Sequence, residues 1–321
     1  MRRPSFLTGL GATLTLPLAA EAQQPAKLPS IGSLQSARNE NAVAFIQALR
    51  DAGYLDGRNA VVETRIYGGM PERLPHLAEE LVALKCDVIV AASPYSIRAA
   101  TRATSTIPIV GIDLESDPVA SGWARSLSHP GGNFTGLFLD LPELGGKLVE
   151  LLKEAVPGLT RVAALWDFTI GQVQFRATEA AARAAGVAVR SLPIQRLGDS
   201  KDAFERDARQ RLPGVIVLSS PLIAYERSEI GTLALKNRLP TISLSPLFVG
   251  SGGLMAYGPD LPDMYKRAAT YVDRIFKGAK VGDLPIERPS RFQLVINLTS
   301  AKALGLTIPP SLLQRADQVI E

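Results

Sequence analysis

The sequence is poor in the residues on which most catalytic and metal sites depend. It contains one cysteine, Cys86, and two histidines, His76 and His129, among 321 residues. A single cysteine excludes an internal disulfide and a cysteine-based metal site, and neither histidine has metal-ligand spacing to a second ligand. The sequence also lacks a Gly-x-Ser-x-Gly elbow, a phosphate loop and a Gly-x-Gly-x-x-Gly helix start. We therefore expect a protein that binds rather than catalyses, without metal or cofactor.

A strong charge of one sign is also missing. Lys and Arg total 35 against 31 Asp and Glu, a formal net charge of +4, and aromatic residues make up only 6% of the chain. No basic stripe with interleaved aromatics is present, so we expect no nucleic-acid partner. The hydrophobic content of 46% is typical of a globular chain, and the length suits two domains with a core in each.

Long hydrophobic runs are absent except at the N-terminus. Arg2-Arg3 precedes an apolar run over 6–20, and Ala20-Glu21-Ala22 is a small-x-small cleavage site. The run is too short to span a bilayer and has no stop-transfer pattern after it. We expect 1–22 to be a cleaved export signal and the mature chain to begin near Gln23 in the periplasm. The export route, Sec or twin-arginine, stays open because the spacing after the arginine pair departs from the twin-arginine pattern.

Beyond the signal, apolar strand-like runs alternate with helical patterns. The first series of expected strands covers 29–34, 60–67, 87–92, 107–112 and 133–139. A second series covers 161–166, 188–194, 214–219 and 241–244. Strands that are apolar throughout and separated by helices indicate parallel sheets covered on both faces. The repetition favours two doubly wound, Rossmann-like α/β domains over one very wide sheet.

The last part of the chain does not start a third unit. We expect the strand at 253–258 and the helix at 260–278 to complete the first domain, and the strand at 292–298 to complete the second. The chain would then cross between domains near residues 140, 255 and 287, and three crossings would form a hinge. The expected N-terminal lobe is 23–140 with 256–286, and the expected C-terminal lobe is 141–255 with 287–321.

Eight short segments recur in one order that is similar to a known family. They are Ile31-Gly32-Ser33-Leu34, Leu49-Arg50-Asp51-Ala52-Gly53-Tyr54, Leu81 with Asp87-Val88-Ile89-Val90, Thr106-Ile107-Pro108-Ile109-Val110, Asp117-Pro118-Val119, Pro130-Gly131-Gly132-Asn133-Phe134-Thr135-Gly136, Gly252-Gly253-Leu254-Met255-Ala256-Tyr257-Gly258-Pro259 and Leu294-Val295-Ile296-Asn297-Leu298. Together they resemble the substrate-binding proteins of ABC importers, in the subfamily similar to the tryptophan- and tyrosine-binding lipoproteins. The resemblance covers essentially the whole mature chain.

The resemblance implies a type I periplasmic-binding-protein fold that captures a small molecule, such as an amino acid or a related aromatic or branched acid, between two lobes. It implies delivery to an ABC permease and its cytoplasmic ATPase by a monomeric binding protein. Gram-positive relatives carry a lipid-attached cysteine after the signal, whereas this chain has Ala22-Gln23, which resembles the soluble branch. An exported sensor that signals to a membrane receptor and an α/β enzyme remain the alternatives.

Candidate ligand contacts follow the strands, because doubly wound sheets bind ligands at the carboxyl ends of their strands. In the first domain these candidates are Ser33, Gln35, Ser93, Tyr95, Asp113 and Asp140. In the second domain they are Trp166, Asp167, Ser219, Ser220 and Ser245.

The serines that precede Pro94 and Pro221 place a hydroxyl at an expected helix start, which favours a ligand carboxylate. Plain helix capping is the alternative interpretation. Asp113 and Asp140 are candidates for a ligand ammonium group, although Asp140 has the spacing of a capping box and Asp113 also fits a solvated acidic loop.

Two further candidates are aromatic. Trp166 and Tyr95 would face each other across the cleft and grip a planar ligand, unless Trp166 belongs to the core. Asp167 would either pair with a ligand cation or cap the next helix.

Overall fold

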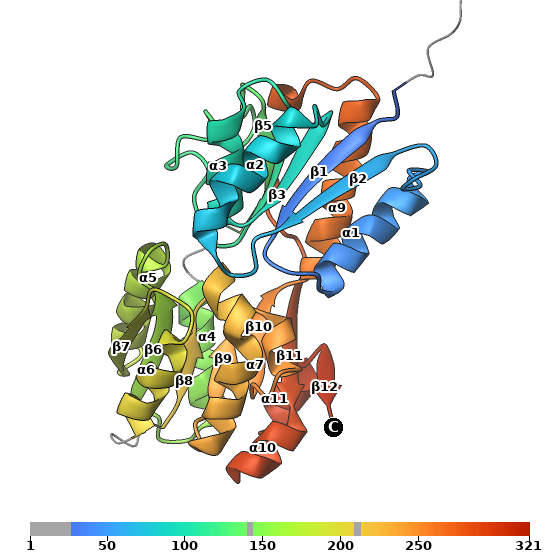
Figure 1. Ribbon diagram of the computed structural model, residues 1–321. Helices are drawn as coiled ribbons and strands as arrows, with labels where there is room; N and C mark the ends of the chain where they lie inside the picture. The colour runs from blue at the N-terminus through green and yellow to red at the C-terminus, as the bar shows by residue number, and fades with distance from the viewer. Residues whose placement is uncertain (1–26, 140–143, 209–212) are drawn as a thin grey trace, which may run out of the picture.

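The computed structural model describes residues 27–139, 144–208 and 213–321 and shows two α/β lobes, one above the other (Figure 1). Each lobe is built on one β-sheet with helices on both faces. The predicted signal at 1–22 and the candidate Asp140 lie outside the described residues. No helix in the described ranges is long and apolar enough to cross a membrane.

The first lobe contains a five-stranded parallel sheet in the order β2-β1-β3-β4-β5. Its strands are β1 (Ser30–Gln35), β2 (Val61–Ile66), β3 (Val88–Ala92), β4 (Ile109–Asp113) and β5 (Phe134–Phe138). Every residue of β1, β3, β4 and β5 is buried, as the continuous apolar runs predict, whereas β2 is half-buried at the edge. The carboxyl ends of all five strands point to the same edge because the sheet is parallel.

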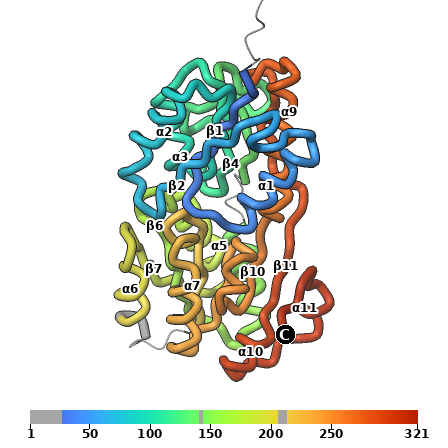
Figure 2. The backbone as a smooth tube through the Cα atoms, turned by 45° about the vertical axis from the view of Figure 1, so that its right-hand side comes forward, coloured from blue at the N-terminus to red at the C-terminus, as the bar shows by residue number. Residues whose placement is uncertain are grey.

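Helices from distant parts of the sequence cover this sheet. The short η1 (Pro71–Arg73), α2 (Leu74–Ala83) and α3 (Pro94–Ala103) lie on one face, and α1 (Glu40–Asp51) lies on the other. Next to α1 lies α9 (Leu261–Phe276), whose Met264, Ala268 and Val272 complete the core. Figure 2 shows α9 in the upper lobe, although the strand before it, β10, and the next strand after it, β11, belong to the sheet of the lower lobe.

The second lobe contains a seven-stranded sheet in the order β12-β11-β10-β9-β8-β6-β7. Its strands are β6 (Arg161–Asp167), β7 (Ala188–Ile194), β8 (Val215–Val217), β9 (Thr241–Ser243), β10 (Met255–Pro259), β11 (Phe292–Asn297) and β12 (Gln318–Ile320). The pairs from β7 to β10 are parallel, β11 runs antiparallel to β10, and β12 runs parallel to β11.

Two groups of helices cover the second sheet. On one face lie α4 (Leu144–Ala155), α5 (Gln172–Ala184), α10 (Leu298–Leu304) and α11 (Pro310–Arg315). On the other lie α6 (Asp199–Ala208), α7 (Pro221–Lys236) and the short α8 (Pro246–Val249). A further short turn of helix, η2 (Val281–Asp283), follows α9 in the first lobe.

The predicted fold class is confirmed, but one strand is in the other sheet. The expectation that the strand at 253–258 completes the first domain is wrong, because β10 pairs with β9 and β11 of the second sheet. The second crossing therefore comes after Pro259 rather than near residue 255. Glu287 still pairs with Leu137 of the first lobe, so the third crossing follows Glu287. The sheet that a strand joins depends on its hydrogen-bond partners, which lie elsewhere in the sequence. The local sequence pattern of β10 therefore does not show which sheet it joins.

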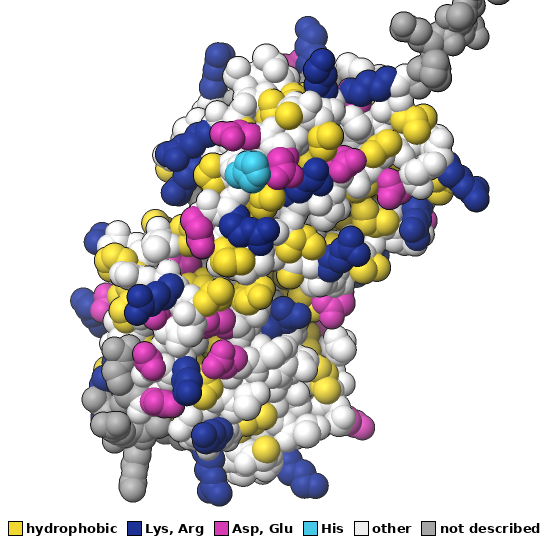
Figure 3. Space-filling view, viewed as in Figure 1, with side chains coloured by type: hydrophobic (Ala, Val, Ile, Leu, Met, Phe, Trp, Pro, Cys, Tyr) yellow, Lys and Arg dark blue, Asp and Glu magenta, His cyan; other side chains and the backbone are white. Residues whose placement is uncertain are grey.

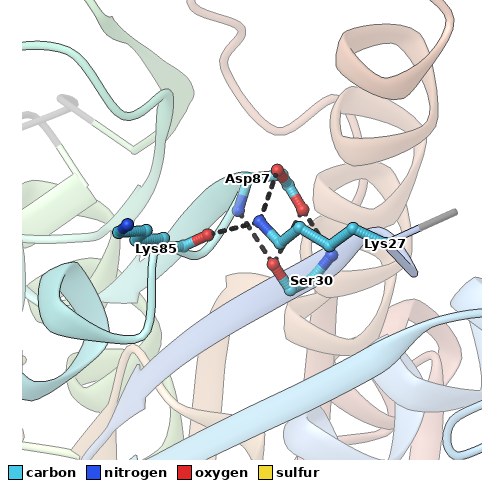
Figure 4. Close-up of polar contacts among 4 residues, drawn as sticks. All are labelled: Lys27, Ser30, Lys85 and Asp87. Atoms are coloured by element: carbon cyan, nitrogen blue, oxygen red, sulfur yellow. Dashed lines mark hydrogen bonds and ion pairs between the residues drawn. The ribbon is translucent and has the colours of Figure 1, made fainter. Parts of the chain in front are cut away.

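The lobes meet at a waist where hydrophobic side chains gather on the surface (Figure 3). Far from this waist, the start of β1 is tied to the residues before β3 (Figure 4). Asp87 Oδ2 accepts hydrogen bonds from Ser30 N at 2.8 Å and Ser30 Oγ at 2.7 Å, and Lys27 Nζ lies 3.1 Å from Oδ1. Burial alone would raise the pKa of the Asp87 carboxyl, but these donors outweigh it and lower that pKa.

Candidate functional site

A cavity of about 120 Å³ lies between the lobes, where the carboxyl ends of the strands of both sheets meet. Five predicted candidates line it together: Ser93, Asp113, Ser219, Ser220 and Ser245. The rule that ligands bind at the carboxyl ends of parallel strands thus predicted the location of this cavity. Whether these residues contact a ligand stays a prediction.

The wall that the first lobe contributes is acidic. Asp113 ends β4, is only 1% exposed, and accepts a hydrogen bond from Glu115 N at 3.0 Å through Oδ1. Its second oxygen, Oδ2, is buried without a partner. Burial raises the pKa of the Asp113 carboxyl. Burial also raises the pKa of Glu115 well above its usual range, and the neighbouring charge of Asp113 raises it further.

The wall that the second lobe contributes supplies hydroxyl and amide groups. Ser219 Oγ donates to Glu115 Oε1 of the first lobe at 2.5 Å. Gln174 on α5 holds this arrangement, because its Oε1 accepts from Ser219 N at 3.2 Å while its Nε2 donates to Leu114 O at 3.4 Å. These bonds join the lobes directly beside the cavity, so the structure shows a closed arrangement.

A second polar contact between the lobes lies outside this cavity. Tyr95 at the start of α3 donates its hydroxyl to Asp167 Oδ2 at 3.0 Å and contacts Thr169 Oγ1. Asp167 Oδ1 accepts from Thr169 N at 2.9 Å and from Thr169 Oγ1 at 2.5 Å. Burial, together with the nearby Asp167 charge, raises the pKa of Tyr95. Asp167 is thus engaged with protein donors, and it connects the lobes.

Two of the candidate serines act as helix caps. Ser93 Oγ accepts from Ser96 N at 3.2 Å at the start of α3, and Ser220 Oγ accepts from Ile223 N at 3.0 Å at the start of α7. The alternative interpretation of capping therefore holds for both hydroxyls. Ser93 has a φ of +124°, a strained conformation for a residue with a side chain, and such strain often occurs at functional sites.

Besides Tyr95 and Asp167, three more candidates do not line the cavity: Trp166, Ser33 and Gln35. The hypothesis that Trp166 and Tyr95 face each other across the cleft is wrong, because the Trp166 ring stacks on Phe175 at 4.6 Å inside the second lobe. Trp166 Nε1 also donates to Ser191 Oγ at 2.8 Å. Successive side chains on a strand point to opposite faces, and that alternation separates Trp166 from Asp167.

Ser33 and Gln35 point into the first lobe. Both side chains are buried, and Gln35 Nε2 donates to Ser33 Oγ at 2.6 Å. The residues after β1, including Ser36, Asn39 and Asn41, line the cavity in their place.

Several cavity residues were not candidates from the sequence: Asn39, Asn41, Glu115, Arg227 and Tyr265. Glu115 could have been predicted, because it lies two residues beyond Asp113 on the same loop. Gln174, which connects the lobes, gave no local signal because it sits within a helix and meets Leu114 and Ser219 only after folding.

A larger cavity of about 490 Å³ also lies between the lobes and shares Leu114 and Glu115 with the first. Its other lining residues include apolar side chains from both lobes: Leu139, Leu144, Ile170, Val173, Leu218 and Leu244. The cleft therefore combines a small polar cavity with an adjoining apolar one. Among the residues that the structure describes, no group of histidine, cysteine and acidic side chains is placed to hold a metal ion.

Comparison with solved structures supports this architecture. A conserved domain protein from Vibrio cholerae O1 biovar El Tor is similar with a TM-score of 0.84 and 25% identity, over 91% of this chain and 100% of that one. A Streptococcus pneumoniae ABC domain in complex with L-Trp gives a TM-score of 0.83 and 24% identity, again over 91% and 100%. These similarities confirm the predicted type I periplasmic-binding-protein-like fold.

Comparison of the sequence points to one family. The chain is 28% identical over 270 residues to the tyrosine-binding protein of Clostridioides difficile (strain R20291), a match that covers 82% of this chain and 75% of the relative. The model of the ABC transporter substrate binding protein family matches residues 35–320. The chain therefore belongs to the ABC transporter substrate-binding protein family.

Proposed function

We propose that this protein is the binding component of an ABC importer, which captures a small molecule between its lobes and delivers it to a permease driven by a cytoplasmic ATPase. The observation that carries this proposal is the cavity lined by both lobes, with Asp113 and Glu115 on one wall and Ser219 and Ser245 on the other. A ligand that contacts both walls binds the closed state better and shifts the population toward it. Closure then marks the protein as loaded for the permease.

The ligand class that we propose is an amino acid with an aromatic or branched side chain. The relative from Clostridioides difficile is named for tyrosine, and the pneumococcal structure contains L-Trp. The small polar cavity suits the ammonium and carboxylate groups, and the adjoining apolar cavity offers space for the side chain. We propose that the ligand leaves chemically unchanged, because the family to which the chain belongs binds its substrates for transport.

Ligand identity is tested by mass spectrometry of what co-purifies and by thermal-shift screening of amino acids, purines and aromatic acids. A ligand at a hundredfold excess over its dissociation constant stabilises the protein by roughly 2.7 kcal/mol. We expect L-tyrosine or L-tryptophan to raise the melting temperature and to be recovered intact after hours of incubation. Stabilisation by a purine alone would contradict the amino-acid class, and turnover of the ligand would favour an α/β enzyme.

The protein is proposed to work in the periplasm as a monomer. Arg2-Arg3, the apolar run over 6–20 and the site after Ala22 support export. N-terminal sequencing of protein from the native host should begin near Gln23, and recovery of chains that start at Met1 in the cytoplasm would refute this.

A further inference from the structure

A tight turn of the first lobe lies against the second lobe. It covers residues 67–70, directly after β2, and Met70 N donates to Tyr67 O across it at 3.1 Å. Its two central residues, Gly68 and Gly69, have φ angles of +63° and +73°. Positive φ at both central positions is the pattern of a type I′ turn, which glycine adopts without steric cost. We call residues 67–70 the glycine turn.

The two glycines of this turn have different surroundings. A Cβ atom at position 69 would lie 3.1 Å from Tyr225 Cγ and 3.3 Å from Leu197 Cδ2, both of which belong to the second lobe. A Cβ atom at position 68 would meet nothing closer than Met70 Cε, at 3.8 Å. Carbon atoms pack best at about 3.5 to 4.0 Å, so even one carbon at position 69 would press on the other lobe. A larger side chain adds atoms beyond this Cβ, and the turn or the Tyr225 ring would then have to move.

The surface of the second lobe that meets Gly69 is held in place by a buried carboxylate. Tyr225 lies on α7, and Leu197 lies in the loop before α6. Glu226, the residue after Tyr225, is 6% exposed and accepts hydrogen bonds from Gly198 N at 2.5 Å and from Ser200 Oγ. These bonds tie the loop of Leu197 to α7, so the two side chains that face Gly69 form one fixed surface.

The glycine turn is held in place within the first lobe as well. Tyr67 is 1% exposed, its N donates to Gln35 O at 3.1 Å, and its hydroxyl lies 3.3 Å from Ser93 Oγ. Gly68 N donates to Ser36 O at 3.1 Å. The turn is therefore attached to the end of β1 and to the start of α3, and it cannot move away from the second lobe without losing these bonds.

Tyr225 connects this contact to the ligand cavity. It lines the polar cavity at the start of α7, where Figure 1 shows the loop after β2 close by. The residue is 45% exposed, so contacts within its own lobe cover only part of it. Gly69 lines neither the polar nor the apolar cavity, and it reaches them only through Tyr225.

We propose that Gly69 is a positioning residue of the binding site, because the absence of a side chain there lets the lobes approach closely enough to place Tyr225 against the ligand. This inference rests on the proposed function, in which one ligand contacts both lobes. The turn geometry accounts for glycine at both central positions, whereas close approach to the second lobe is a second and independent reason that applies to Gly69 and not to Gly68.

The test compares Gly69→Asn with Gly68→Asn, because asparagine tolerates positive φ better than most residues with a side chain. Calorimetry with L-tyrosine and L-tryptophan should show that Gly69→Asn binds about 10- to 100-fold more weakly than the wild type, the range expected for overpacking of a close contact. Gly68→Asn should stay within threefold. Equal losses in both variants would show a local effect of the turn and overturn the proposal.

A double-mutant cycle separates positioning from a merely structural role. In a Tyr225→Ala background the ring that meets position 69 is gone, so Gly69→Asn should lower affinity by less than threefold. Leu84→Ala is the control background, because Leu84 is an exposed side chain at the end of α2, away from the cleft, and the full loss should persist there. The same loss in both backgrounds would contradict the proposal.

Two further outcomes also decide the matter. The new side chain collides between lobes, and their separation relieves the collision, so Gly69→Asn should fold; an unfolded Gly69→Asn beside a folded Gly68→Asn would overturn the proposal. Wild-type protein that binds neither amino acid would refute the proposed ligand class alone. Mass spectrometry of the small molecule that co-purifies would then replace calorimetry, and equal amounts on the two variants, or none on the wild type, would refute the role of Gly69.

Discussion

Two strands, β4 in the first lobe and β6 in the second, both end in a buried aspartate at the cleft. Asp167 at the end of β6 accepts hydrogen bonds from Tyr95 Oη, Thr169 N and Thr169 Oγ1. Asp113 at the end of β4 accepts one from Glu115 N and leaves Oδ2 unpartnered. The difference teaches that position alone does not define a ligand contact. A carboxylate that the protein satisfies stabilises the structure, whereas an unsatisfied oxygen such as Asp113 Oδ2 is the atom that we propose for a ligand contact.

The largest effect should come from Asp113→Asn. Affinity for L-tyrosine should fall by about 10- to 100-fold, as expected for loss of a charge-assisted hydrogen bond. Calorimetry on the folded variant measures this change. If affinity stays within threefold of the wild-type value, the proposed difference in role between Asp113 and Asp167 is wrong.

The same variant should not lose stability. Since the folded-state pKa of Asp113 is raised above its unfolded value, the wild-type carboxyl stabilises the fold at low pH and loses that contribution as the pH rises through the folded pKa. Asp113→Asn should therefore equal or exceed the wild type in unfolding free energy at pH 8 and lose this advantage near pH 4. Denaturant unfolding at both pH values checks the sign.

Asp167→Asn should have the opposite effect: it should lower stability and leave ligand affinity unchanged. The amide cannot accept from all three donors, so the free energy of unfolding should drop by about 1 to 3 kcal/mol. Tyr95→Phe removes only the contacts of Tyr95 Oη with Asp167 and Thr169 and serves as the control, with a loss near 1 kcal/mol or less. A large loss of affinity in Asp167→Asn at unchanged stability would instead make Asp167 a ligand contact.

Two neighbouring serines, Ser219 and Ser220, should show the same contrast between a ligand contact and a structural contact, with smaller effects. Ser220→Ala removes the cap of α7 and should cost about 1 kcal/mol of stability, with ligand affinity unchanged. Ser219→Ala removes the bond to Glu115 and should lower affinity severalfold while stability changes by about 0.5 kcal/mol or less. Reversed outcomes for the two serines would show that the ligand contact is assigned to the wrong hydroxyl.

The smallest effect is expected from Asp87→Asn, far from the cleft. The lowered pKa of Asp87 means that its carboxylate stabilises the fold above its unfolded pKa, and this contribution is lost as the pH falls through the folded pKa. Because the side chain is 41% exposed, solvent screening limits the effect to less than about 1 kcal/mol. Thermal melts between pH 7 and pH 3 should show a shallower decline in the variant, and ligand affinity should not change.

Local sequence patterns were sufficient to predict most helices and strands of both lobes. The continuous apolar runs of β3 and β4 and the apolar stripe of α4 are properties of short segments, which explains that success. The lobe to which β10 belongs was predicted wrongly, because its pairing with β9 and β11 is a long-range property. The short β12 was not predicted for the same reason, since its three residues are defined by pairing with β11.

The site was predictable to the extent that it follows from parallel-sheet topology. That topology brought Asp113 and Ser219 to one cavity from opposite lobes. It could not show that Trp166 turns into the core, nor that Gln174 on α5 would bridge the lobes, because both depend on side-chain direction after folding. It also could not distinguish Ser219 from Ser220, where one hydroxyl caps a helix and the other crosses the cleft.

The most direct test of the account is a crystal structure of the protein with L-tyrosine bound. We predict the ligand between the lobes, its amino nitrogen about 3 Å from Asp113 Oδ2 and its ring in the apolar cavity beside Leu218 and Leu244. A ligand whose amino group pairs with Asp167, or one bound outside the cleft, would contradict the account.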